Sequence, residues 1–136
     1  MNMTDNIVSM AVPDRYEPVA VYYHDSDCVE YVREDAFVIY DRVDEFLTLI
    51  HDRTGHQLLG FKLKGFKYIF MEKLEPIYRL NESQFLTLVS AIEAICSIVG
   101  GNLFEDERRA AAYQAARKMA QDYRAELRHF NFEMAA

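Results

Sequence analysis

The sequence predicts an α+β fold, in which an antiparallel β-meander of about five strands is followed by a two-helix hairpin packed on one face of the sheet. Two patterns indicate this class. Between residues 19 and 63, short segments alternate apolar and polar residues and are separated by turn residues, as half-buried strands are. Between residues 85 and 128, apolar residues recur instead at the three- and four-residue spacing of helices.

The strand half is divided by turns rich in Asp, Glu and Gly. The expected strands are 19–24, 28–33, 36–40, 46–51 and 56–63. Asp25 and Asp27 predict the first turn, because Asx side chains hydrogen-bond nearby backbone groups. Gly55 ends the clearest turn, since it can take the positive φ that a type I turn with a bulge requires. Gly60 marks a bulge or a close approach of two backbones.

Two helices are expected in the second half of the chain. Asn81 or Ser83 caps the first, whose apolar face runs from residue 85 to residue 99 before Gly100 ends it. The second runs from about residue 105 to residue 128, with acids in its first turn and bases in its last. Its apolar residues form one seam for a partner helix: Ala112, Ala116, Met119, Tyr123, Leu127 and Phe130. Residues 66–73 fit either a strand or a short helix.

The length of the chain and the positions of its prolines predict the domain organisation. At 136 residues the chain has the size of one domain. Residues 1–18, which hold two of the three prolines, are expected to form a flexible arm. Residues 19–136 are expected to form a single α+β domain, with the sheet in 19–80 and the helical hairpin in 81–130.

The sequence also predicts a cellular location. Its first residues lack a basic n-region, and its longest apolar segment, 85–99, is interrupted by polar residues. Neither a signal peptide nor a membrane span is therefore expected. Cys28 and Cys96 lie in apolar patterns, where a free cysteine behaves as a small hydrophobe. We expect a reducing, cytoplasmic setting.

The net charge of −7 is unevenly distributed, because residues 1–60 hold twelve acids and four bases, whereas residues 61–136 hold ten acids and eleven bases. An acidic half disfavours direct binding to nucleic acid, whose proteins present basic patches. Acids of the strand half are the candidate partner-binding residues: Glu30, Glu34, Asp35, Asp41, Asp44 and Glu45. They could bind another protein, mimic the phosphates of a nucleic acid, or be simply solvated. The basic stretch 62–79 could protect a sheet edge or meet residues 14–52 of a second copy in a homodimer.

Catalytic and cofactor motifs are not found. The serines lack a Gly-x-Ser-x-Gly elbow, and no phosphate loop, dinucleotide fingerprint or metal-ligand spacing occurs. An enzyme is therefore disfavoured and no cofactor is expected. The candidate ligand-binding residues are His51, Asp52 and His56, which flank or begin the Gly55 turn; two exposed turn-flanking histidines are the simpler interpretation.

Aromatic residues are concentrated in the expected strands. They are Tyr22, Tyr23, Tyr31, Phe37 and Tyr40. Strand aromatics usually pack in the core or against helices, which is the expectation here, and a ligand groove is the alternative.

One part of the chain resembles a known family. Residues 22–32, Tyr-Tyr-His-Asp-Ser-Asp-Cys-Val-Glu-Tyr-Val, are followed at a distance by residues 48–61, Thr-Leu-Ile-His-Asp-Arg-Thr-Gly-His-Gln-Leu-Leu-Gly-Phe. Together they resemble a widespread bacterial family of small β-rich domains of unknown function. The matching positions are Tyr22 or Tyr23, Asp25, Asp27, Tyr31, Asp52, Gly55, Leu59 and Gly60. Lys62 and Lys64 stand where that family usually places an acid. The resemblance implies a fold and no established chemistry.

These observations favour a non-enzymatic interaction module, of bacterial or phage origin, that binds another protein through its acidic β-half. Regulatory, immunity or antitoxin, and inhibitor roles all fit this expectation. The alternative is a small-molecule or metal-binding domain that uses a cleft between sheet and helices near His51 and His56.

Overall fold

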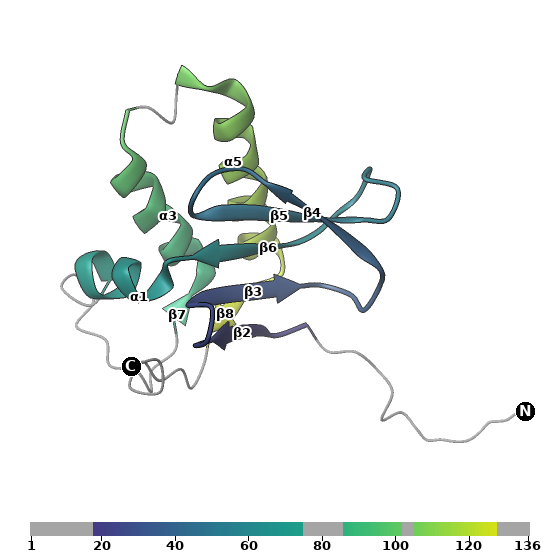
Figure 1. Cartoon of the computed structure of the whole chain (residues 1–136), viewed down its shortest axis with the longest axis horizontal. Coiled ribbons are helices and arrows are strands. Elements are labelled where there is room, and N and C mark those ends of the chain that lie inside the picture. Colours follow the sequence, from purple (N-terminus) through teal and green to yellow (C-terminus); the bar gives the residue numbers. More distant parts are fainter. Residues whose placement is uncertain (1–17, 75–85, 102–104, 128–136) are drawn as a thin grey trace, which may run out of the picture.

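The computed structural model describes residues 18–74, 86–101 and 105–127. These residues form a mixed seven-stranded sheet with helices packed on one of its faces (Figure 1), so the α+β class is confirmed. The strands are β2 (Ala20–Tyr23), β3 (Cys28–Val32), β4 (Val38–Arg42), β5 (Leu47–Asp52), β6 (Leu58–Lys64), β7 (Leu86–Thr87) and β8 (Glu126–Leu127). The helical elements are α1 (Phe66–Ile69), the π-helical turn η1 (Phe70–Leu74), α3 (Leu88–Val99) and α5 (Glu107–Asp122).

The five expected strand segments are present, but they do not form a simple meander. The spatial order is β4-β5-β6-β3-β2-β8-β7, so β3 pairs with β6 rather than with β4. In this register Val29 lies opposite Leu63 and Tyr31 opposite Phe61, and all four side chains are buried. Pairing β3 with β6 therefore brings apolar residues together on the helix side of the sheet, and it leaves the largely exposed β4 at an edge.

The core lies between the sheet and the helices. Alternate residues of the central strands face it: Val29, Tyr31, Leu47, Leu49, Phe61 and Leu63. Helices α3 and α5 pack against each other and cover this face, and α1 and η1 add a further helical segment that the expected two-helix hairpin did not include. A forked ion pair also joins them, in which Arg117 donates from Nε (3.0 Å) and Nη2 (2.7 Å) to Glu93 Oε2.

Residues 66–73, for which the sequence allowed either a strand or a short helix, are helical and belong to α1 and η1. Asp27 holds the start of this segment, because its Oδ1 accepts from Lys67 N at 2.8 Å and its carbonyl accepts from Gly65 N at 3.0 Å. Asp27 adopts a positive φ of 51° to do so. Phe66, Ile69 and Phe70 then pack into the core.

Both long helices are shorter than the sequence predicts. Helix α3 begins at Leu88, and Thr87 caps it by accepting from Ser90 N at 3.3 Å. Leu86 and Thr87 themselves form β7, so the apolar pattern before residue 88 belongs partly to a strand. The expected caps Asn81 and Ser83 lie outside the described residues. Gly100 ends the helix with a φ of 70°, as predicted.

Helix α5 ends at Asp122 rather than near residue 128. Arg124 takes the left-handed conformation (φ 53°), and its N–H bonds to the Gln121 carbonyl while Ala125 N–H bonds to the Ala120 carbonyl. These two bonds form a Schellman motif with arginine in the position usual for glycine. The chain then enters β8, which runs parallel to β2 and antiparallel to β7 and buries Leu127. The helical seam therefore ends at Met119; Tyr123 is exposed, and Phe130 lies outside the described residues.

Both structural glycines of the strand half behave as predicted. Gly55 has a φ of 80° and its N–H bonds to the Asp52 carbonyl at 2.9 Å. Gly60 lies beside a register shift between β5 and β6, and a β-carbon at residue 60 would stand 2.0 Å from the Tyr31 carbonyl oxygen. Lys62 and Lys64 do not protect an edge, because β6 lies inside the sheet between β5 and β3.

Candidate functional site

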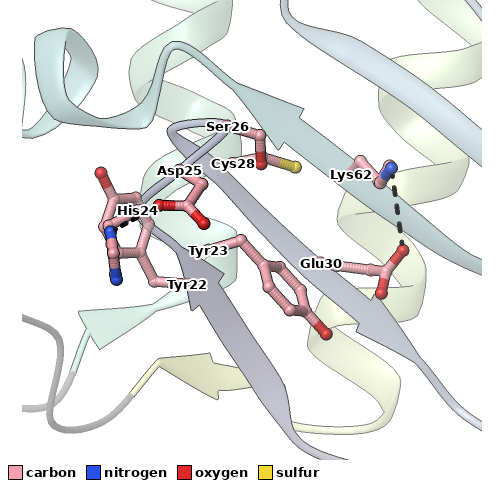
Figure 2. Close-up of a pocket in the computed structure, with 8 residues that line it drawn as sticks. All are labelled: Tyr22, Tyr23, His24, Asp25, Ser26, Cys28, Glu30 and Lys62. Atoms are coloured by element: carbon pink, nitrogen blue, oxygen red, sulfur yellow. Dashed lines mark ion pairs between the residues drawn. The ribbon is translucent and has the colours of Figure 1, made fainter. Parts of the chain in front are cut away.

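The face of the sheet opposite the helices carries the candidate site. Strand pairing places Glu30 opposite Val21 on one side and Lys62 on the other, Tyr23 opposite Cys28, and Tyr40 opposite Ile50. These side chains alternate with those that enter the core. We call Val21, Tyr23, Glu30, Tyr40 and Lys62 the open face, since the described helices lie on the other side of the sheet (Figures 1 and 2).

Lys62 occupies the middle of the open face. Its Nζ lies 4.0 Å from Glu30 Oε2 on β3 and 4.7 Å from the centroid of the Tyr40 ring on β4. One ammonium group therefore links three strands by an ion pair and a cation–π contact. Both members of the ion pair are partly buried, with 31% of the Lys62 and 21% of the Glu30 side chain exposed.

A hollow of about 370 Å³ opens beside this pair, over the β2–β3 hairpin (Figure 2). It is lined by Tyr22, Tyr23, His24, Asp25, Ser26, Cys28, Glu30 and Lys62. His24 Nδ1 lies 3.2 Å from Asp25 Oδ1 at its rim. Burial raises the pKa of the Cys28 thiol, so this cysteine is a poor nucleophile at neutral pH.

Exposed aromatic and aliphatic side chains flank the ion pair. Tyr23 is 46% exposed, and Val21 and Tyr40 are exposed as well. The expectation that strand aromatics pack in the core is wrong for Tyr23, Phe37 and Tyr40, and correct for Tyr31. The alternation of side chains along a strand could have indicated this. Tyr22 packs against the core, and Tyr23 is the next residue of the same strand, so the two rings must lie on opposite faces of the sheet.

The six candidate acids do not form one surface. Glu30 lies on the open face, whereas Asp41 and Asp44 face helix α5. Arg108 Nη2 donates to Asp41 Oδ1 at 2.7 Å, and Arg109 Nε donates to Asp44 Oδ2 at 2.8 Å. These two acids of the strand half are therefore neutralised within the chain.

Asp44 is the most strongly bound of the acids. Tyr113 Oη donates to its Oδ2 at 2.7 Å, and the N–H groups of Phe46 and Leu47 donate to its Oδ1 at 2.8 Å each. Burial by itself raises the pKa of Asp44, but the bonds from Tyr113, Leu47, Phe46 and Arg109 outweigh it and hold the pKa below its ordinary value. Asp44 thus joins a turn of the sheet to helix α5.

The other three acids are accessible. Glu34 and Asp35 precede β4 and are exposed; Glu34 lies 3.9 Å from Arg33 Nη1. Glu45 has 69% of its side chain exposed and lies 3.9 Å from Arg109 Nη2. Long surface pairs of this kind contribute little and leave the carboxylates available to a partner.

The three candidate ligand-binding residues have separate surroundings. His51 Nε2 lies 3.9 Å from Asp41 Oδ2, and its buried Nδ1 has no hydrogen-bond partner among the described residues. Asp52 binds its own turn, accepting from Thr54 Oγ1 at 2.7 Å and from His56 N at 3.2 Å. His56 is exposed. Within residues 18–74, 86–101 and 105–127, no group of three or more His, Cys, Asp or Glu side chains is placed to hold a metal ion.

Comparison of the chain with protein-family models, with curated proteins and with solved structures gives no match. None of the helices in the described part of the chain is long and apolar enough to cross a membrane.

Proposed function

We propose that the protein is a non-enzymatic interaction module that binds another protein through the open face of its sheet. One observation carries the proposal: the described helices cover a single face of the sheet, and the opposite face presents exposed Val21, Tyr23 and Tyr40 around the Glu30–Lys62 pair. Exposed apolar surface of this kind is typical of contact sites between proteins.

The composition of the open face supports a protein as the ligand. Tyrosine is enriched at the centres of interfaces, where a few residues contribute most of the binding energy. The Glu30–Lys62 pair would contribute to the orientation and specificity of the contact. The adjoining hollow, which Tyr23 and Lys62 line, would receive one anchoring side chain of the partner. Glu34, Asp35 and Glu45 supply exposed acids elsewhere on the strand half and favour a partner with basic residues. Regulatory, immunity or antitoxin, and inhibitor roles fit this surface.

The proposal is tested by capture of partners from host lysate with three versions of the chain. The wild type should retain a stoichiometric protein, and Tyr23→Lys should lose it, because the substitution places an extra cation beside Lys62 in the middle of the contact. Tyr68→Lys is the matched control, since Tyr68 is exposed to a similar extent (55% against 46%) but lies on α1. Equal capture by the wild type and Tyr23→Lys would contradict the proposal, as would loss of the partner from Tyr68→Lys alone.

A small molecule in the hollow is the second candidate. The volume of about 370 Å³ falls within the range of about 300–1,000 Å³ that is usual for ligand sites, and His24, Asp25 and Lys62 supply polar groups. Native mass spectrometry of the purified chain separates the two. An additional small mass that is present in the wild type and absent from Tyr23→Lys would favour the ligand, and protein without any added small mass would favour the protein partner.

A further inference from the structure

We propose that β4 pairs in antiparallel fashion with β4 of a second copy of this chain, with Ile39 on the two-fold axis, so that one continuous sheet runs through a homodimer. The surface involved is the backbone edge of β4, which adjoins the open face through Tyr40. The variant that disrupts this edge changes Ile39, which lies outside the open face, so failure of this inference can be told apart from failure of the proposed function.

Among the described strands, β4 is an edge whose backbone groups on one side have no strand partner. It is the terminal strand of the seven-stranded order and pairs only with β5 among the described strands. Val43 N donates to the Leu47 carbonyl at 2.9 Å, which makes residues 43 and 47 a hydrogen-bonded pair. Because hydrogen-bonded and non-hydrogen-bonded pairs alternate along an antiparallel ladder, Val38, Tyr40 and Arg42 direct their N–H and C=O groups away from β5. A further strand at this edge could form backbone hydrogen bonds with these three residues.

The edge has little of the usual protection against pairing, since its charged residues are Asp41 and Arg42 at the C-terminal end. Its residues Val38 to Arg42 include no proline, glycine or lysine, and the chain is apolar at and just before it: Phe37 is 79% exposed and Ile39 is 46% exposed. The opposite edge, β7, has two residues in the described part of the chain, and short edge strands pair poorly. Of the two edges, β4 is the longer and therefore the better able to pair with another strand.

A second copy is the occupant because the strand complements itself in one register. Residues whose backbone N–H and C=O groups point away from β5 must pair with residues of the same kind in the second copy. This requirement restricts the two-fold axis to a few positions along β4. An axis at Asp41 sets two Asp41 carboxylates face to face, and an axis at Tyr40 sets Ile39 against Asp41. An axis at Val38 pairs β4 with its copy at Val38 alone. An axis at Ile39 pairs Ile39 with Ile39 and Val38 with Tyr40, and Asp41 and Arg42 then face Phe37 and Ala36, which precede the other strand. It also carries Arg42 of each copy toward Glu34 and Asp35 of the other, which adds charge complementarity.

Light scattering across a range of protein concentrations tests the assembly. The wild type should approach twice its chain mass of 15.9 kDa, and Ile39→Lys, which sets two ammonium groups against each other on the axis, should remain monomeric. Val21→Lys is the matched control: Val21 is 40% exposed in β2, away from the β4 edge, and its replacement should leave the dimer intact. A wild type that stays monomeric at millimolar concentration overturns the proposal, as does an Ile39→Lys variant that still dimerises.

Cysteine cross-linking tests the register without disturbing the fold. Facing residues of a non-hydrogen-bonded antiparallel pair have Cα atoms about 4.5 Å apart, within the range of about 4.4–6.8 Å that a disulfide spans. Ile39→Cys should therefore form a covalent dimer under a copper–phenanthroline oxidant. Tyr40→Cys should not, because Tyr40 faces Val38 of the other copy. The wild type, whose Cys28 and Cys96 are free thiols, is the background control. Cross-linking of Tyr40→Cys in place of Ile39→Cys would overturn the register.

Discussion

At the scale of single residues, two aspartates hold distant segments together. Asp44 accepts from the N–H groups of Phe46 and Leu47 in its own turn, as Asx residues commonly do, whereas Asp27 lies in a turn and accepts from Tyr22 Oη at 2.7 Å. Each also binds a group far away in sequence. For Asp27 the distant partner is Lys67 N, and for Asp44 it is the pair Arg109 and Tyr113. The sequence indicates the turn role of such residues. Their distant partners follow only from the packing of helices against the sheet.

Asp44→Asn should lower the free energy of unfolding by about 2 kcal/mol at pH 7, because it removes charge-assisted hydrogen bonds to a largely buried carboxylate. The folded-state pKa of Asp44 lies below the ordinary value of 3.8, so its contribution is present above about pH 4 and is lost as the pH falls through the folded-state pKa. Urea titrations between pH 7 and pH 2 should therefore show the difference between wild type and variant shrinking below about pH 4.

The control for this prediction is Asp35→Asn, since Asp35 is an exposed acid of the same strand half. It should change the unfolding free energy by less than about 0.5 kcal/mol. A difference between wild type and Asp44→Asn that does not depend on pH would refute the assigned role of the carboxylate charge.

At the scale of elements, the contact between β3 and β6 depends on the absence of a side chain at residue 60. Gly60→Ala should cost about 3 kcal/mol or more, because its β-carbon would lie 2.0 Å from the Tyr31 carbonyl oxygen and 2.9 Å from the Val32 α-carbon. The nearest atoms all belong to the backbone of β3, so no flexible side chain could move aside. Thermal and urea unfolding measure the loss, and Gly101→Ala is the matched control because no described atom lies within 4 Å of its added β-carbon. Equal stability of the two variants would disprove the close approach.

The C-terminal ends of α3 and α5 are formed in different ways. Glycine marks the end of α3 correctly, since Gly100 adopts a positive φ. No glycine marks the end of α5, where Arg124 takes the left-handed position. Burial of Ala125 and Leu127 and the pairing of β8 with β2 compensate for that strained residue. Tertiary contacts therefore end a helix whose local sequence would allow it to continue.

At the scale of the whole molecule, sheet and helices share one core and several polar ties, including Asp44 with Arg109 and Glu93 with Arg117. The expected single domain over residues 19–136 should therefore unfold in one cooperative step. Far-UV circular dichroism follows the helices, and the fluorescence of the nine tyrosines, in a chain without tryptophan, follows tertiary packing. The two urea transitions should coincide. Separate midpoints would show that the sheet and the helices unfold as independent units.

The class of fold and the positions of the turns follow from local patterns in the sequence. Strand periodicity, the Gly55 turn and the glycine after α3 are local properties, because side-chain spacing and backbone freedom act over a few residues. Tertiary structure alone decided the order of the strands, the short β7 and β8, and which acids remain accessible. Asp41 and Glu45 look alike in the sequence; one is bound by Arg108 of α5 and the other is exposed because of where that helix packs. The open face exists only once the helices have covered one side of the sheet, and the β4 edge exists only once β3 has paired with β6. No local pattern states which face will be buried or which strands will pair.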